Sequence, residues 1–223
     1  MIRRIALAAA LAVACTPLCA TTYILESQHT EGVIRWDHLG FSHPTAQFTL
    51  VEGTLDFDQA DPTRSSVMAT IKLANLSSGV PDLDDNLHSV DFFDIAKYPT
   101  ATFKSTRVEK GAAPNMLKVT GDLTLRGVTR PVVLDVTINK VGTNIRSNLP
   151  SVGFEATTTL KRSDFGLGMY VPQVSDEVSI HITCQADEAK AYARQLKQEA
   201  DEAADDAKAA AKKAADAAAA AQQ

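Results

Sequence analysis

The sequence is poor in cysteine, in positive charge and in long apolar runs. It holds 3 cysteines in 223 residues, and its 22 Lys and Arg face 27 Asp and Glu, for a formal net charge of −5. Few cysteines argue against a disulfide-stapled scaffold. The acidic balance argues against a nucleic-acid-binding surface. Beyond the first residues, no segment is apolar enough to suggest a membrane-spanning helix.

Motifs of common catalytic and metal sites are also missing. The chain has no HExxH, CxxC or Gly-x-Ser-x-Gly pattern, and its 5 histidines form no group with metal-ligand spacing. Gly166-Leu167-Gly168 is only a fragment of a phosphate-binding loop and indicates a loop with positive φ. The sequence therefore predicts no enzymatic activity, no catalytic residue, no metal site and no cofactor beyond a bound lipid considered below.

Residues 1–20 have the pattern of a secretory signal peptide. Arg3 and Arg4 precede a short apolar stretch, and Ala20 supplies the small residue expected at the cleavage site. The stretch is too short to cross a bilayer. We expect a mature protein that begins near Thr21 and resides in the periplasm. The less favoured alternative is a lipoprotein anchored at Cys15.

Cleavage at this site would leave Cys184 as the one cysteine of the mature chain. A single cysteine cannot form an internal disulfide, so the domain would depend on its apolar core. Cys184 lies in an alternating apolar run, and we interpret it as a small buried apolar residue.

Between Thr22 and Gln185, apolar and polar residues alternate with a period of two. This pattern indicates strands with one buried side and one solvent-facing side, as in antiparallel sheets. The runs fall at 48–57, with a bend or bulge at Gly53, and at 67–73, 117–125, 132–138, 152–160 and 178–184. Residues 126–129 connect two of them as a β-hairpin. The pattern predicts a sandwich or a closed barrel over residues 21–185, without distinguishing the two.

Two segments depart from this rhythm. Within residues 81–98, Leu83 and Leu87 have helical spacing, which predicts a short helix or structured loop capped near Pro81. Residues 186–223 have no Gly or Pro and are about half Ala, which favours a helix. This tail has no apolar stripe beyond its start, so we expect a solvated helix. The alternative is a spacer or a contact for a partner.

Two long motifs resemble the signature of the YceI family. They are Val90-Asp91-Phe92-Phe93-Asp94-Ile95-Ala96-Lys97-Tyr98-Pro99-Thr100-Ala101-Thr102-Phe103-Lys104-Ser105 and Val119-Thr120-Gly121-Asp122-Leu123-Thr124-Leu125-Arg126-Gly127-Val128-Thr129-Arg130-Pro131-Val132. Shorter matches lie around His29, Gly53 and Arg162, and together they cover residues 22–184. The resemblance implies an all-β, lipocalin-like antiparallel barrel of about eight strands with one short helix. The Ala-rich helical tail lies outside it.

The resemblance also implies a function. Members of the family are described as exported proteins that bind polyisoprenoid lipids, such as isoprenoid quinones or prenyl diphosphates, in an apolar channel. Such a barrel can fill its interior or hold one ligand. We expect transient membrane contact for loading and no nucleic-acid partner; a homodimer is a further expectation. The alternative is a ligand-free structural or stress-related domain of the envelope that acts through protein contacts.

The predicted channel residues are mainly aromatic and aliphatic. For each of them, the ordinary role of a core residue is the competing interpretation. They are Trp36, His38, Phe41, Phe48, Leu83, Leu87, Phe92, Phe93, Phe103, Leu123, Phe154 and Phe165. Four cations are candidates for gripping a diphosphate head group, with none preferred, namely Arg126, Arg130, Lys161 and Arg162.

Overall fold

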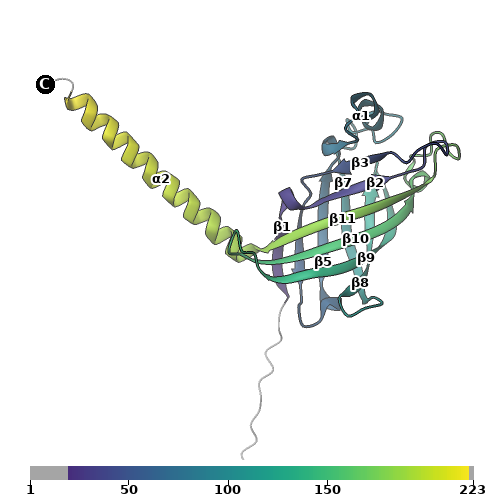
Figure 1. Ribbon diagram of the computed structural model, residues 1–223, viewed down its shortest axis with the longest axis horizontal. Helices are drawn as coiled ribbons and strands as arrows, with labels where there is room; N and C mark the ends of the chain where they lie inside the picture. The colour runs from purple at the N-terminus through teal and green to yellow at the C-terminus, as the bar shows by residue number, and fades with distance from the viewer. Residues whose placement is uncertain (1–19, 221–223) are drawn as a thin grey trace, which may run out of the picture.

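A computed structural model describes residues 20–220 of the chain (Figure 1). Most of the predicted signal peptide, including Cys15, lies outside the described residues. The chain forms an antiparallel barrel with two α-helices. The strands are β1 (Thr21–Leu25), β2 (Glu31–Arg35), β3 (Thr45–Phe48), β4 (Glu52–Phe57), β5 (Ser66–Lys72), β6 (Leu76–Ser77), β7 (Thr100–Lys110), β8 (Met116–Leu125), β9 (Val128–Thr143), β10 (Pro150–Lys161) and β11 (Glu177–Glu188), and the helices are α1 (Pro81–His88) and α2 (Ala189–Ala220).

Eight strands close the barrel in the order β1-β4-β5-β7-β8-β9-β10-β11, and β11 pairs back to β1. Every neighbouring pair is antiparallel. Of the two architectures that the alternation allowed, the structure is therefore the closed barrel. Closure removes the free strand edges that an open sheet would expose.

Three neighbouring strands break at a similar level of the barrel. β1 continues into β2, β3 into β4 and β5 into β6, each after a short irregular segment. Beyond the breaks, β2 still pairs with β11 and β3 with β6, but β6 is a free edge of the sheet. The barrel wall is therefore interrupted between β6 and β7 at this end, which we call the open end.

The bend predicted at Gly53 lies a few residues earlier. The break between β3 and β4 contains Leu50, whose φ is 55°, whereas Gly53 pairs with Ala69 inside β4. A Cβ atom at position 53 would lie 2.2 Å from the carbonyl oxygen of Met68. The glycine is thus needed for a close approach of two strands, not for a bend.

A cap segment, residues 78–98, covers the open end (Figure 1). Its helix α1 begins at Pro81, which suits the first helical position because it has no N–H to leave unpaired. Leu83 and Leu87 turn toward the barrel interior, and Leu87 is buried. The helix is tied to β6, because Asp84 accepts a hydrogen bond from Ser77 (2.6 Å) and His88 Nε2 lies 2.9 Å from the Leu76 carbonyl oxygen.

The strand β11 is longer than the sequence predicts. It runs to Glu188, and Ala186 to Glu188 pair with β1, so the tail begins at Ala189 and not at 186. Ala186 is fully buried, and the Asp187 carboxylate accepts a hydrogen bond from Ser151 at 2.5 Å. The change to Ala-rich sequence therefore starts inside the last strand.

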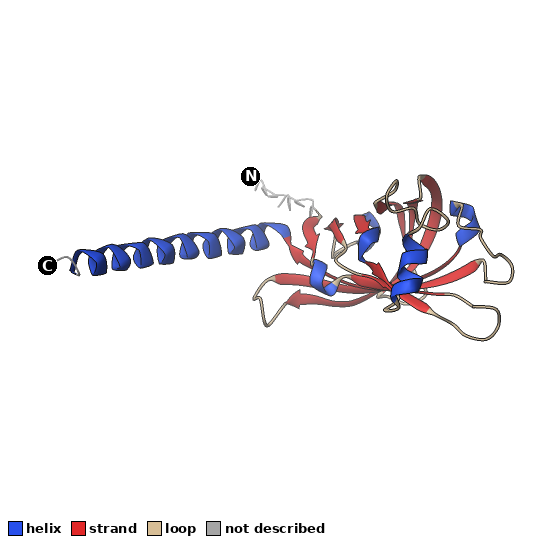
Figure 2. Cartoon of the chain, turned by 90° about the horizontal axis from the view of Figure 1, so that it is seen from above, coloured by secondary structure: helices blue, strands red, loops and turns tan. Residues whose placement is uncertain are grey.

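Helix α2 projects away from the barrel in both views (Figures 1 and 2). It leaves from the end opposite to the cap segment. Its first turns contact the barrel through buried Ala191 and half-buried Tyr192. From Lys197 to Ala214 its side chains are exposed, as expected for an Ala-rich helix without an apolar stripe. No helix among residues 20–220 combines the length and the apolar character needed to cross a bilayer.

Candidate functional site

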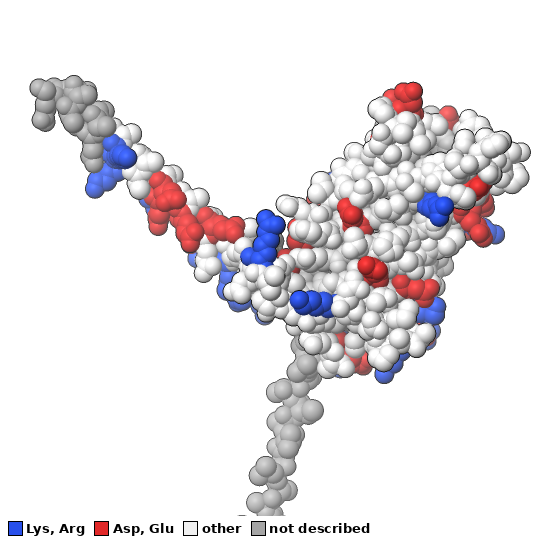
Figure 3. All heavy atoms as spheres, in the orientation of Figure 1, with Lys and Arg blue, Asp and Glu red and all other residues white. Residues whose placement is uncertain are grey.

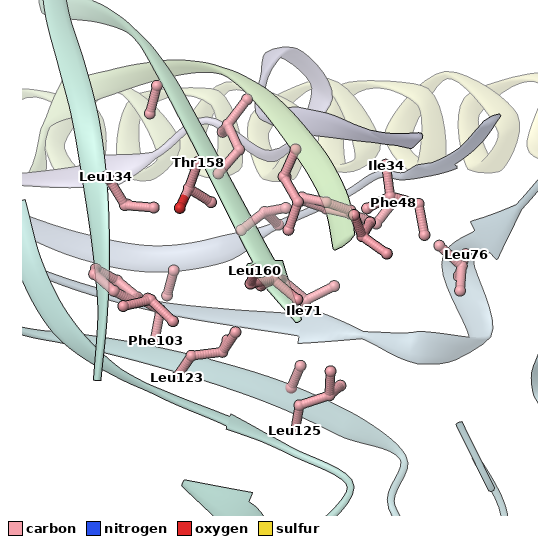
Figure 4. Close-up of a pocket in the computed structure, with 18 of the residues that line it drawn as sticks. Ile34, Phe48, Ile71, Leu76, Phe103, Leu123, Leu125, Leu134, Thr158 and Leu160 are labelled. Carbon is pink, nitrogen blue, oxygen red and sulfur yellow. The ribbon is translucent and has the colours of Figure 1, made fainter. Parts of the chain in front are cut away.

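The barrel encloses a cavity of about 390 Å³ (Figure 4). All eight barrel strands contribute to its wall, and successive lining residues of a strand are commonly two apart in sequence, as in Phe154, Ala156, Thr158 and Leu160 of β10. This spacing follows from the pleat, which turns alternate side chains to the same face. The volume is within the range of small-molecule sites in proteins.

The cavity is long as well as apolar. Along β8 it extends from Leu117 to Leu125, a distance of about 27 Å at the usual rise of a strand. Near the open end it is lined by Trp36, Phe92 and Tyr170, among others. Such a shape suits an extended chain better than a compact ring system.

Two glycines help to keep the interior empty. Gly32 pairs with Phe48, and a Cβ atom at position 32 would lie 2.2 Å from the Phe48 ring. A Cβ atom at position 121 would likewise lie 2.3 Å from the Phe103 ring. Each phenyl ring therefore lies flat over the backbone of a neighbouring strand. Larger residues at the two glycines would push both rings into the cavity.

Several of the few polar groups of the wall are already paired within the protein. Thr158 donates a hydrogen bond to the Val133 carbonyl oxygen (2.8 Å), and Thr30 donates to that of Gln185 (3.1 Å). Burial raises the pKa of the Cys184 thiol to about 11, so it is neutral at pH 7. No group of residues among 20–220 has the composition and closeness of a metal site. The cavity therefore offers mainly apolar contact.

Arg162 is the one Lys, Arg, Asp or Glu in the described lining. Its guanidinium donates to the backbone carbonyl oxygens of Leu167, Val174 (3.0 Å) and Ser175 (2.8 Å). Desolvation lowers the pKa of Arg162, and the nearby Asp176 opposes this effect. The charge thus fixes the shape of the loop between β10 and β11, which forms one side of the cavity mouth.

Arg126 joins the cap segment to the rest of the open end. It lies on the two-residue turn between β8 and β9, where Arg126 and Gly127 have φ of 51° and 73°, as a type I′ turn requires. Its guanidinium donates to the carbonyl oxygens of Val90 (2.7 Å) and Gly166 (2.6 Å). Three segments that are distant in sequence are thereby connected by one side chain.

Comparison with known proteins identifies this architecture. Residues 23–186 match the YceI-like domain. The chain belongs to the YceI family. A protein named YceI from Escherichia coli O157:H7 is 36% identical over 165 residues, which cover 74% of this chain and 85% of that protein. A UPF0312 protein from Pseudomonas syringae pv. tomato is 39% identical over 150 residues, covering 66% and 77%.

Solved structures show the same fold. Campylobacter jejuni YceI is 31% identical, with a TM-score of 0.61, and covers 68% of this chain and 89% of its own. Burkholderia cenocepacia BcnA is 26% identical, with a TM-score of 0.62 and coverage of 70% and 95%. A polyisoprenoid binding domain from Saccharophagus degradans is 14% identical, with a TM-score of 0.59 and coverage of 75% and 99%, and shares the fold.

The motifs that resemble the YceI signature meet at the open end. The first spans the second half of the cap segment, the second contains Arg126, and the third contains Arg162 and Gly166. Gly166 has a φ of 76°, as predicted for this loop. A Cβ atom at Gly127 would lie 2.8 Å from the Tyr98 ring, so the turn also packs directly on the cap segment. Much of the signature therefore builds the mouth of the cavity.

The structure brings ten of the twelve predicted channel residues to the cavity wall. They are Trp36, His38, Phe48, Leu83, Leu87, Phe92, Phe93, Phe103, Leu123 and Phe154. The other two are corrections. Phe41 is 90% exposed on the loop between β2 and β3. Phe165 does not line the cavity but is buried in a cluster with the wall residues Leu73, Ala101 and Leu125.

The sequence-based list omitted most of the aliphatic lining. The missed residues include Ile71, Leu134, Leu160, Ile180 and Ile182. Their alternation was visible in the sequence, and assigning every inward position of each strand to the wall would have found them. Of the four candidate head-group cations, Arg126 and Arg162 are engaged by backbone carbonyl oxygens, while Arg130 and Lys161 have exposed side chains outside the wall.

Proposed function

We propose that this protein binds one long isoprenoid lipid inside the barrel and carries it through the periplasm. The observation that supports this best is the long apolar cavity, which runs through the barrel and opens at one end. The structural neighbour described as a polyisoprenoid binding domain agrees with it. The N-terminal pattern of a signal peptide supports the proposed location.

The lining favours recognition of the chain over recognition of the head group. The one charged lining residue, Arg162, already donates to three carbonyl oxygens. A diphosphate buried here would lack free cationic partners, and burying an unpaired charge is costly. A neutral head group of the quinone type fits the interior better, and a diphosphate would remain in water at the mouth.

Physical chemistry indicates where such a lipid is exchanged. Each buried CH₂ group is worth about 0.8 kcal/mol relative to water, so a chain of tens of carbons has negligible solubility as a free molecule. A bilayer and the barrel are both apolar, and transfer between them is close to balanced. The protein should therefore load and release its lipid during transient contact with a membrane.

The direct test is mass spectrometry of lipids that co-purify with the wild-type protein, expressed with its N-terminal segment and never exposed to detergent. We expect one isoprenoid lipid per barrel in a large fraction of molecules. A protein that repeatedly carries no lipid, and takes none from vesicles containing isoprenoid quinone, would refute the proposal.

Gly32→Ala sharpens this test. The new methyl group should push the Phe48 ring into the cavity and reduce lipid content. Gly142→Ala is the matched control, because a Cβ atom at Gly142 meets only the flexible end of Lys140, at 3.9 Å. Lipid content that falls in Gly32→Ala and not in Gly142→Ala, with both variants folded by circular dichroism, supports binding inside the barrel. Equal lipid content in the two variants would place the lipid elsewhere.

A further inference from the structure

Two loops at the open end expose apolar side chains beside the cavity mouth. The first rim loop, residues 36–44, joins β2 to β3, and the second rim loop, residues 166–176, joins β10 to β11. On the first, Leu39 is 48% exposed and Phe41 is 90% exposed, and on the second Tyr170 is 61% exposed. Tyr170 also lines the cavity, so the exposed apolar surface is continuous with the interior.

The two rim loops form one unit. His38 and Val174 form a β-bridge, the Asp37 N–H donates to Ser175 Oγ (2.9 Å), and the Ser175 N–H donates to the Asp37 carbonyl oxygen (3.0 Å). The Tyr170 ring lies 6.4 Å from that of Phe92 in the cap segment. The exposed apolar side chains are thus presented on a fixed frame.

The tip of the first rim loop is a costly way to display apolar residues to water. Leu39 has a φ of 62° and Gly40 a φ of 74°, and the Phe41 N–H donates to the His38 carbonyl oxygen (3.1 Å), which closes a tight turn. Positive φ is unfavourable for leucine, and turn tips ordinarily hold Asn, Asp or Gly. Nothing in the fold needs Leu39 or Phe41 there, because neither packs into the core.

Between the aspartates at their bases, Asp37 and Asp176, the rim loops lack charge. Residues 38–51 and 165–175 contain no Asp, Glu, Lys or Arg, in a chain that is 22% charged. In Figure 1 the dark loop after β2 and the green loop after β10 meet at the right, and Figure 3 shows this part of the molecule largely without charged side chains. The exposed acidic residues Asp82 and Asp85 lie on α1 instead.

We propose that Leu39, Phe41 and Tyr170 form a docking surface that inserts into the interface of an uncharged lipid bilayer and places the cavity mouth against it. This proposal rests on the proposed function, since the bilayer is where a long isoprenoid lipid resides. Aromatic side chains suit the interface between head groups and acyl chains. Without basic residues, the contact gains nothing from anionic lipids, and the acidic α1 disfavours them. Three inserted side chains give weak and reversible binding, as exchange requires.

The test is flotation of the purified protein with phosphatidylcholine vesicles. We expect the wild type to float and Phe41→Ser to bind about tenfold more weakly, because burial of a phenylalanine is worth at least that factor. Leu39→Asn should also weaken binding while keeping the turn, since Asn tolerates positive φ. The matched control is Ile145→Ser, which removes a 97% exposed apolar side chain from the turn between β9 and β10 at the opposite end.

Several outcomes would overturn the proposal. One is equal flotation of Phe41→Ser and Ile145→Ser, and another is binding that requires anionic lipid or is lost at high salt. A third is a wild type that is dimeric in sedimentation and a Phe41→Ser variant that is monomeric, with neither binding vesicles, since the surface would then hold a second copy.

Failure of the proposed function, lipid binding in the cavity, would give different results. Phe41 does not line the cavity, so lipid content should be unchanged in Phe41→Ser. A wild type that floats but never carries lipid would refute lipid binding inside the barrel, while the proposed docking surface would stand.

Discussion

Replacing Arg126 by Asn should loosen the cap segment without unfolding the barrel. The guanidinium is the connection between Val90 of the cap segment, Gly166 of the second rim loop and the β8–β9 turn. Asn is chosen because Asn-Gly is the preferred sequence of a type I′ turn, so the backbone of residues 126 and 127 is not penalised. The substitution therefore removes the two hydrogen bonds and little else.

The magnitude follows from the geometry. The two hydrogen bonds are 2.6 and 2.7 Å long and both have a charged donor. Such bonds contribute about 1.5–3 kcal/mol each when buried. Arg126 is half-exposed, and water competes for the same groups, so a total of about 1–2 kcal/mol is the reasonable expectation. The population of molecules with an open cap segment should rise about 5- to 30-fold.

Hydrogen exchange followed by mass spectrometry measures this directly. The amides of Phe93 and Tyr98, which bond to the carbonyl oxygens of Leu87 and Asp94, should exchange faster in Arg126→Asn, while amides of β8 serve as the internal reference. Arg130→Gln is the control, because Arg130 donates only to the carbonyl oxygen of its neighbour Thr129. Unchanged exchange in the cap segment, or an equal rise in all strands, would show that Arg126 does not hold the cap segment.

Three further predictions concern other parts of the chain. Deleting residues 197–223 should lower the melting temperature by less than about 3 °C, whereas deletion from Ala186 onward also removes the β1–β11 pairing and should lower it by about 6–12 °C in calorimetry. The Cys184 thiol should react with Ellman's reagent at pH 8 only after unfolding. Because burial raises the pKa of this thiol to about 11, its contribution to the free energy of unfolding should be complete below about pH 8.5 and lost as the pH rises through 11. Hydrogen bonds from Ser77 and Ser78 lower the pKa of Asp84, so the stability that Asp84 gives to the cap segment should be complete above about pH 4 and lost on further acidification. The loss should appear as faster hydrogen exchange in the cap segment at low pH, and this pH dependence should be absent in Asp84→Asn.

The inward face of the barrel was predictable from sequence because a pleated strand obeys a strict rule. Once Leu117, Val119, Leu123 and Leu125 are assigned to one face, the pleat places them in a common wall. The short helix was predictable from the spacing of Leu83 and Leu87 together with the proline that starts it. Both inferences depend on local geometry, which a sequence records directly.

Contacts between distant segments were not predictable in this way. Phe41 and Phe48 were both assigned to the channel as aromatic residues, yet one is 90% exposed and the other is buried against Gly32. The partners of Arg126 lie 36 and 40 residues away in sequence, and they are backbone atoms, whose positions no residue type indicates. Sequence reasoning treated Arg126 as a free cation, and tertiary structure made it a connector.

The cavity wall and the cavity mouth are built from different kinds of interaction. The cavity wall needs only apolar side chains of suitable size, and many substitutions preserve that property. The mouth instead depends on specific groups, since Arg126 and Arg162 together fix the cap segment and the second rim loop through five backbone carbonyl oxygens. A lipid of different length or head group could therefore be accommodated by changes in the wall alone. The opening through which it passes would keep the same construction, because its hydrogen bonds depend on those two arginines.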